Sequence, residues 1–550
     1  MGVARRCAAE AAARHLPVNG RRRFSGTGGS RGYSRTLTRA IGLVALLCAA
    51  PPARLPALQC ADGSPPPCRA TRADPGRKPG VAPNSVAVLY FDNLSRDTAD
   101  TYLADGLSEE IIAELGRISR LTVKSRGAVL RYRGAADLVN AGRALRVAHV
   151  VNGSLRHAGR RLRVNVELMR VPSGDRLWGT VYDRDAADLF SIQRDVAIAV
   201  ATAIAGHLLP RERASLTRQP TRDGDAYDHF VKGNYYLAKR NARTALRAID
   251  EYRAATGLDS SFTPAFARIA LAYALSLDWG WFSVALPAES LLTRAIAASD
   301  RALRQDSSSS DAWMARGYVL LERDQKTLAG ALRAFERAIA LDPRNAEAVH
   351  QYGDALWAVG LDSAAGDAYQ RALDLDPERA ITLYRFAVLR MRQGEYNGAL
   401  RLLDSTLSVD PGFARAYATR AQYEWSLGQT GKARRDAEVA VRLGAGSDGE
   451  AVLAAVDAKD GDTLSGRARI DTLLRGPIDS LHPDVLEGYS VGWALVVLNE
   501  GARAIDLLER VRPRGWALWA RLQSPRFDPI RADPRFQRLL EDARPAEARR

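Results

Sequence analysis

The C-terminal half of the chain repeats its residue pattern every 34 residues. An apolar residue followed by Asp and Pro recurs at 341–343, 375–377 and 409–411. Small residues keep the same interval at Gly360, Gly394, Gly428, Ala331, Ala365, Ala399 and Ala433. A fixed period of this length indicates stacked helical hairpins, because one hairpin cannot bury its apolar face alone. The repeat therefore predicts an all-α solenoid.

Each residue type in the period has a place in a helical hairpin. Small alanines let two helices approach closely, glycine ends the first helix, and proline starts a new helix after the turn. The clearest units are 310–345, 346–379, 380–413 and 414–447. Weaker units flank them at 226–259, 263–309, 448–476 and 483–512. The unit 263–309 contains an inserted loop, which begins with Asp278 and runs Asp-Trp-Gly-Trp-Phe-Ser-Val.

These units resemble the tetratricopeptide repeat (TPR). The resemblance implies a right-handed TPR α-solenoid over 225–545, which ends in a polar cap that includes 527–536 and holds a partner segment in its concave groove. In this family the second, fifth, ninth and twelfth positions of a unit face the groove. Here these positions are held by Leu321, Trp357, Met391, Trp425, Glu347, His350, Tyr384, Arg415, Tyr318, Asp354 and Gln422.

The large side chains in the groove positions allow two interpretations. Trp357, Trp425 and Met391 are residue types that anchor bound peptides, because they offer much apolar area. The alternative is that they pack against the neighbouring helix, as an aromatic residue at helical spacing usually does. If they are anchors, partner affinity is expected to depend on Trp357 and Trp425.

Residues 83–212 follow a different pattern, which predicts a small mixed α/β domain. The continuous apolar run 85–91 indicates a strand that is buried on both faces. Alternation along 162–168 indicates a strand with one face open to solvent or to a partner. The expected order is β-α-β-α-β-β-β-α, with a last helix at 189–209 that Pro210 stops, followed by a linker at 213–224.

Several segments of this domain are similar to the TolB N-terminal-like family. They include Val-Ala-Val-Leu-Tyr-Phe-Asp-Asn-Leu-Ser at 86–95, Tyr-Leu-Ala-Asp-Gly-Leu-Ser-Glu-Glu-Ile at 102–111, and segments at 151–155 and 188–193. In that family the domain commonly precedes TPR repeats and often follows an adenylate cyclase, a protein kinase or a winged-helix DNA-binding domain. The resemblance implies a sensory or assembly role and brings no established catalytic residues.

Four acidic residues in this domain suggest an acid/base or metal site, namely Asp92, Asp105, Glu109 and Glu110. A structural interpretation explains them better. An Asp-Asn pair after a strand suits a turn, and acids early in a helix suit its positive N-terminal end. No His or Cys stands near them, so we expect no metal site here.

Most of the net charge lies at the N-terminus. The chain carries +16, but residues 1–82 contain 14 basic residues against three acids, which leaves +5 for the other 468 residues. The positive residues are mostly Arg and form no basic stripe with interleaved aromatics, so we expect no nucleic-acid partner. All four cysteines fall within the first 68 residues. The remainder therefore has no disulfide framework and no cysteine metal site.

The N-terminal region also contains an apolar segment at 40–50, which follows Arg35 and Arg39 and precedes a Pro-rich linker that ends at residue 82. Its length suits the core of a signal peptide better than a membrane span. We therefore expect the protein to be exported (periplasmic or otherwise extracytoplasmic) or membrane-anchored. The alternative is a cytoplasmic chain with a disordered, basic head.

Short catalytic motifs are absent from the sequence. It contains no G-x-x-x-x-G-K-[ST], H-E-x-x-H or G-x-S-x-G, and its seven histidines are scattered. We therefore expect no catalytic residues, no cofactor and no metal. The leading hypothesis is a non-enzymatic scaffold for protein–protein interaction. The alternatives are a sensor module that works with a separate kinase, adenylate cyclase or transcription regulator, and an uncharacterised enzyme that uses the α/β domain.

Overall fold

The computed structural model describes residues 81–97, 100–185, 188–217, 219–239, 241–279, 281, 287–323, 327–475, 489–511 and 518–545. The apolar segment 40–50, the Pro-rich linker up to residue 80 and the four cysteines lie outside these residues. Among the helices within them, none has both the length and the apolar character that a bilayer crossing requires.

A mixed sheet forms the N-terminal part of the described chain. Its strand order is β3-β1-β4-β5-β6, and a short strand β2 also pairs with β4. β1 is parallel to β3 and β4, whereas β4, β5 and β6 form an antiparallel meander. The strands are β1 (Ser85–Val88), β2 (Asp92–Asn93), β3 (Thr122–Val123), β4 (His149–Ala158), β5 (Arg161–Arg170) and β6 (Arg176–Asp185).

The strand predicted at 85–91 is shorter than expected: β1 ends at Val88, and a second short strand, β2, begins only at Asp92. After Val88 the backbone leaves the regular ladder, and the Phe91 amide donates to the Ser108 hydroxyl at 2.9 Å. Ser108 lies on the helix that follows, so the interruption ties the strand to that helix. A continuous apolar run cannot reveal this change of hydrogen-bond partner, because it reports burial alone.

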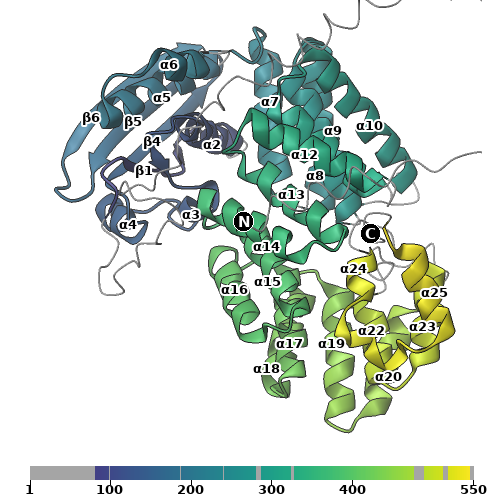
Figure 1. Ribbon diagram of the computed structural model, residues 1–550. Coiled ribbons are helices and arrows are strands. Elements are labelled where there is room, and N and C mark those ends of the chain that lie inside the picture. The colour runs from purple at the N-terminus through teal and green to yellow at the C-terminus, as the bar shows by residue number, and fades with distance from the viewer. Residues whose placement is uncertain are drawn as a thin grey trace, which may run out of the picture. The chain divides into compact units, whose positions relative to one another are not determined.

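Helices cover the sheet on two sides (Figure 1). α2 (Thr101–Gly116) and α5 (Leu189–Ala205) pack on the face that carries Leu162, Val164, Val166 and Leu168 of β5. α3 (Arg126–Leu130) and α4 (Leu138–Ala144) pack over β1 and part of β4 on the other side. Arg163 and Asn165 of β5 are exposed, as the alternating pattern predicts for an open face.

The end of this domain differs from the expectation. α5 ends at Ala205, before the predicted residue 209, because Gly206 adopts a positive φ of 74°. Pro210 then begins α6 (Pro210–Thr217), where its missing amide costs nothing. Most of α6 lies in the segment predicted as a linker, and Arg120 binds its Glu212 at 2.7 Å.

The rest of the chain is mostly helical and forms the α-solenoid that the period predicts (Figure 1). Each of the four clearest units contains one antiparallel helix pair. The pairs are α11 (Ser310–Arg323) with α12 (Leu328–Leu341), α13 (Ala346–Ala358) with α14 (Asp362–Leu375), α15 (Ala380–Arg392) with α16 (Tyr396–Val409), and α17 (Ala414–Ser426) with α18 (Thr430–Arg442).

The flanking units are also helix pairs. Before the clear repeats come α7 (Gly224–Ala238), α8 (Ala242–Leu258), α9 (Thr263–Asp278) and α10 (Ala288–Gln305). After them come α19 (Gly446–Lys459), α20 (Thr463–Leu473), α22 (Tyr489–Val497) and α23 (Gly501–Val511). The solenoid begins against the α/β domain, since Tyr102 of α2 donates to Asp228 of α7 at 3.0 Å.

Glycine has two functions in the repeats. Gly360, Gly394 and Gly428 have φ near +80° and end the first helix of their unit, as predicted. Gly353, inside α13, instead makes room for an aromatic ring, because a Cβ there would lie 2.7 Å from Tyr369 of α14. The repeated prolines differ from the expectation, since Pro343 and its equivalents lie in the turn before the next helix.

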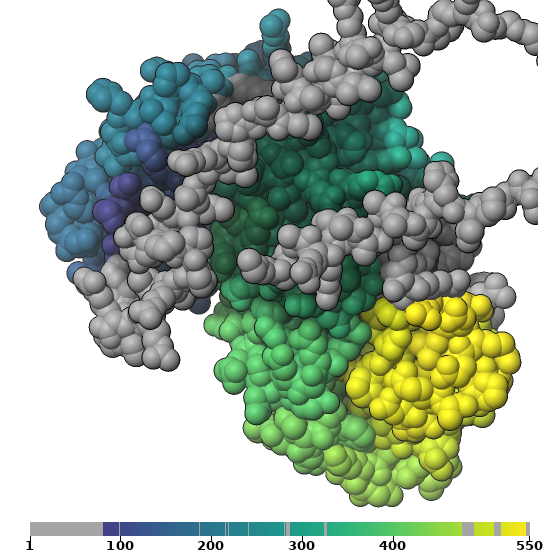
Figure 2. All heavy atoms as spheres, in the orientation of Figure 1, coloured from purple at the N-terminus to yellow at the C-terminus, as the bar shows by residue number. Residues whose placement is uncertain are grey.

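The C-terminal segment consists of α24 (Leu518–Leu522), the 3₁₀ helix η5 (Pro525–Ile530) and α25 (Pro534–Ala543). Phe527 and Phe536 of the predicted cap are buried, with ring centres 5.7 Å apart. The segment does not only cover the last helix pair. It also contacts the middle of the solenoid, because Trp519 of α24 lies against Gly360 after α13. In Figure 2 the C-terminal residues, in yellow, lie against the green repeats.

Gly353→Ala tests the close packing of α13 on α14. The added Cβ would meet the Tyr369 ring, so we expect the free energy of unfolding to fall by about 1–3 kcal/mol. Gly366→Ala on α14 is the control, because its Cβ would have ordinary 3.7 Å contacts. We expect that change to be neutral or to stabilise by up to about 1 kcal/mol. Chemical denaturation measures the free energy of unfolding of both variants. An equal increase in this free energy in both variants would contradict the packing argument.

Candidate functional site

The predicted groove positions lie on the first helices of the repeats, and most of them are covered. Seven of the eleven side chains are buried, namely Tyr318, Leu321, His350, Asp354, Trp357, Met391 and Gln422. Four keep part of their surface, namely Glu347, Tyr384, Arg415 and Trp425. Most of the predicted groove positions are therefore covered by the protein's own residues.

The two predicted tryptophan anchors pack against neighbouring helices. Trp357 is 1% exposed and is among the largest fully buried side chains of the described residues. The Trp425 indole donates to the Ala455 carbonyl at 2.8 Å and meets Trp493 edge to face, with ring centres 5.1 Å apart. Both placements correspond to the packing alternative for aromatic residues at helical spacing.

The residues at the end of α9 also cover predicted groove positions. Asp278 ends α9, and Trp279, which follows it, lies with its ring centre 6.0 Å from Phe413. The Arg415 guanidinium lies over Trp279 at 5.1 Å. Trp279 and Arg415 belong to units that are far apart in the sequence, so the end of α9 contacts α17 directly.

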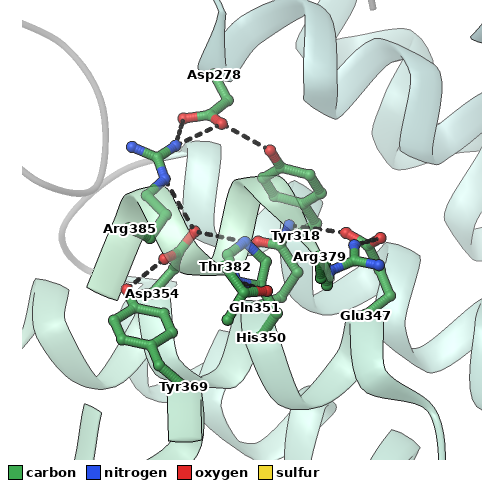
Figure 3. Close-up of polar contacts among 10 residues, drawn as sticks. All are labelled: Asp278, Tyr318, Glu347, His350, Gln351, Asp354, Tyr369, Arg379, Thr382 and Arg385. Carbon is green, nitrogen blue, oxygen red and sulfur yellow. Dashed lines mark hydrogen bonds and ion pairs between the residues drawn. The ribbon is translucent and has the colours of Figure 1, made fainter. Parts of the chain in front are cut away.

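A buried polar cluster holds the end of α9 in place (Figure 3). Arg385 of α15 donates to both Asp278 oxygens, at 2.9 and 3.1 Å, and its Nε lies 3.7 Å from Asp354 of α13. The Tyr318 hydroxyl donates to Asp278 at 2.8 Å, and the Tyr369 hydroxyl donates to Asp354 at 2.5 Å. The cluster therefore joins five helices through one cation and two carboxylates.

His350 and Thr382 extend the cluster in a pattern that superficially resembles a catalytic triad. The Thr382 hydroxyl lies 3.2 Å from His350 Nδ1, and His350 Nε2 lies 3.7 Å from Asp354. Thr382 has no exposed surface and His350 is 1% exposed. A substrate cannot reach the hydroxyl in this arrangement, so the cluster has a structural function here.

Burial also changes the titration of the cluster. The pKa of Asp354 is raised to about 7, first because its carboxylate is removed from water and also because Asp278 is near. The Arg385 charge and the Tyr369 hydrogen bond act in the opposite direction. The pKa of the nearby Glu322 is also well above its usual range, again because of burial. These carboxyls therefore hold protons at a higher pH than exposed ones do.

A cavity of about 120 Å³ remains between the repeats and the C-terminal segment. Four predicted groove residues line it, namely Trp357, Tyr384, Arg415 and Gln422. Sequence reasoning missed the others that matter for its chemistry, namely Arg385, Arg392, Asp448, Tyr489, Arg521 and Arg526. The groove positions name residues within repeats only, so they carry no signal for Arg521 and Arg526, which come from the C-terminal segment.

The acidic residues of the α/β domain have structural partners. Asp105 binds Arg133 through two hydrogen bonds of 2.6 and 2.9 Å, and Glu109 accepts from the Tyr90 hydroxyl at 2.9 Å. Glu110 accepts from Asn234 of α7 at 3.3 Å. Across the described part of the chain, no three potential ligands gather as a metal site would require. The reasons expected for these acids were wrong, however. Asp92 lies in strand β2 and not in a turn, and α2 has no acid in its first turn, so side-chain partners hold Asp105, Glu109 and Glu110 instead of the helix N-terminus.

The middle of the solenoid is similar to known repeats. Two family models, both described as tetratricopeptide repeat, match residues 325–380 and 363–423. The matched residues contain two complete helix pairs, α13 with α14 and α15 with α16, which are therefore TPR units in sequence as well as in arrangement.

Comparison with curated proteins identifies a relative over a limited stretch. The chain is 31% identical over 188 residues to "Putative adenylate cyclase 3" of Rhizobium meliloti. The matched stretch is 34% of this chain and 32% of that protein. The chain therefore spans about a third of the length of this relative.

Solved structures of repeat proteins are similar to part of the chain. A tetratricopeptide repeat protein of Parabacteroides merdae is 16% identical, with a TM-score of 0.34, and covers 50% of this chain and 98% of its own. PilF of Pseudomonas aeruginosa is 19% identical, with a TM-score of 0.32, and covers 40% of this chain and 95% of its own.

Asp354→Asn tests the buried carboxyl. In the wild type the folded state keeps the proton between about pH 4 and pH 7, whereas the unfolded state loses it. As the pH rises through that window, we therefore expect the wild-type free energy of unfolding to fall relative to that of the variant, by about 1.4 kcal/mol for each pH unit. Denaturation at several pH values measures this difference. The exposed Asp367→Asn on α14 is the control. The same pH dependence in both variants would contradict the raised pKa.

Proposed function

We propose that the chain is a non-enzymatic scaffold for protein–protein interaction, with the partner segment held on the concave side of the TPR units. The observation that supports this most directly is the TPR match over 325–423, which ends inside α17 next to a preformed opening. A surface that exists before binding lowers the ordering cost of association.

The proposed contact residues are those that keep exposed surface at or near this opening. Tyr384 and Arg415 line the cavity from α15 and α17 and are half-buried. Glu347 lies one repeat earlier and is bound by Arg379, while Trp425 lies at the far end of α17. A cavity of about 120 Å³ is too small for a chain segment, so the partner backbone would lie across its mouth.

Two further parts of the proposal depend on the N-terminal residues. The resemblance of 83–212 to the TolB N-terminal-like family favours a sensory or assembly role for the α/β domain. The apolar segment 40–50 favours export or membrane anchoring. Mass spectrometry of the N-terminus of the native protein distinguishes a cleaved signal from a retained anchor.

Photo-crosslinking in the native host tests the groove. A benzoyl-phenylalanine at Tyr384 keeps an aromatic ring in place and should form a discrete adduct with one protein. Glu438, exposed on the second helix of its unit, is the matched control position and should form none. Arg415→Glu should remove the adduct, because it reverses a charge beside Tyr384. Identical adducts at both positions, or none at 384, would remove the groove from the proposed function.

A second candidate function is a regulatory module that works with a separate signalling enzyme. The partial likeness to a protein named as a putative adenylate cyclase favours this alternative specifically.

An activity assay separates the scaffold from an enzyme. Purified full-length chain, incubated with ATP and Mg²⁺, should release no cyclic AMP above a protein-free blank, because the sequence contains none of the short catalytic motifs considered above and the described residues hold no group of three potential metal ligands. Sustained, protein-dependent cyclic AMP formation would overturn the non-enzymatic assignment. A parallel reaction with an active adenylate cyclase controls for the detection of product.

A further inference from the structure

The two edges of the β-sheet differ in length. At one edge β3 has only two residues, Thr122–Val123. At the other edge β6 has ten residues, Arg176–Asp185, and among the described residues no strand pairs with its outer side (Figure 1). Every second residue of an antiparallel edge strand directs its amide and carbonyl away from the sheet. β6 therefore offers a row of backbone hydrogen-bonding groups to a further strand.

The middle of β6 lacks the features that usually prevent such pairing. Proteins protect a sheet edge with proline, with charged residues or with a bulge that twists the strand away. The stretch 177–182, Leu-Trp-Gly-Thr-Val-Tyr, contains no proline and no charged residue, and most of its residues favour strands. The irregularity in the β5–β6 register lies between Leu168 and Met169, opposite the first residues of β6. The rest of β6 is therefore a regular and unprotected edge.

The charges near the end of β6 have partners within the same domain. Asp183 forms an ion pair with Arg161 of β5. Arg184 donates to Asp195 of α5 at 2.9 Å. These pairs lower the net charge that a second strand would meet along this edge.

Val181 places an apolar side chain near the centre of the edge. It lies opposite Asn165 of β5, on the open face of the sheet, and it is 50% exposed. Trp178 and Tyr182 lie on the covered face and are partly buried against the core. The edge therefore carries apolar or aromatic side chains on both faces.

We propose that β6 pairs antiparallel with β6 of a second copy of this chain, around a two-fold axis at Val181. An axis perpendicular to the sheet keeps each face continuous, so a residue meets one from the same face of the other copy. Val181 then faces its own equivalent, and Thr180 faces Tyr182. Trp178 faces Arg184, which suits a cation–π contact. No like charges are opposed along this ladder.

The neighbouring registers fit less well. An axis at Thr180 would bring Arg176 and Arg184 together, and like charges that are directly opposite destabilise a ladder. An axis at Tyr182 would leave residues 176–178 unpaired. The strand is therefore most complementary to itself around Val181, and self-complementarity is what a two-fold interface requires. This inference goes beyond the proposed scaffold, because it concerns the α/β domain and not the groove of the repeats.

Sedimentation equilibrium of the full-length chain measures the pairing. The contact is one strand edge, so we expect a reversible dimer with a dissociation constant on the order of 10–100 μM. Val181→Lys opposes two lysines and should raise this constant about tenfold or more. Val81→Lys is the matched control, because Val81 is 49% exposed and precedes β1, and it should dimerise like the wild type. A wild type that stays monomeric at about 300 μM, or equal losses in both variants, would overturn the proposal.

A charge-pairing experiment tests the register and the identity of the partner. Val181→Lys and Val181→Glu should each dimerise weakly alone, because each opposes like charges. Their equimolar mixture should recover dimers, which native mass spectrometry identifies as mixed, since a lysine then faces a glutamate across the axis. A mixture without mixed dimers would overturn the two-fold axis at Val181. A benzoyl-phenylalanine at position 181 that captures a different protein in the host, and no second copy, would also overturn the proposal.

Hydrogen exchange locates the ladder within the chain. Peptides that cover Arg176–Asp185 should exchange more slowly at high protein concentration. Peptides that cover Arg161–Arg170 should not change, because β5 already has a strand on each side. A dimer in which the exchange of β6 is unchanged would associate elsewhere and overturn the proposal. Failure of the crosslinking experiment at Tyr384 removes the scaffold alone, whereas failure of these measurements removes the strand pairing alone.

Discussion

The buried charge of Arg385 determines how the concave side of the solenoid is built. Its side chain is 6% exposed and lies between the carboxylates of Asp278 and Asp354. A buried cation without a partner would cost several kcal/mol. The packing of α15 at this position therefore depends on Asp278, which the end of α9 supplies. The ion pair thereby holds the end of α9 against α15, and the adjacent Trp279 continues the contact to Phe413.

This internal crossing changes which residues a partner could meet. In a plain stack of hairpins, the first helices would present their groove positions to solvent. Here Asp278 and Trp279 cover them from one end, and Trp519 and Phe527 approach from the C-terminal segment. The surface that remains is small, rich in arginine and built in part from the C-terminal segment, which is why its chemistry differs from that of the predicted peptide anchors.

The period predicted the helix pairs well, because glycine and alanine at fixed intervals specify local turns and close packing. Gly360 is an example of the turn, because it ends α13 with a positive φ, and Gly353 is an example of close packing, because it lies against Tyr369. The same period also located Tyr384 and Arg415 at the cavity. It failed to distinguish exposed from buried positions, as Trp357 shows, because burial depends on what the inserted loop and the C-terminal segment place above each helix.

The sequence by itself determined the two kinds of architecture, the α/β order before the repeats and the phase of every clear hairpin, since these follow from residue spacing within one unit. Only the tertiary structure decided that Asp278 meets Arg385 and that Arg526 lies over Tyr423. Those pairs lie about a hundred residues apart. Their contact depends on how distant helix pairs and the C-terminal segment are arranged in space. The residue spacing within one repeat carries no information about that arrangement.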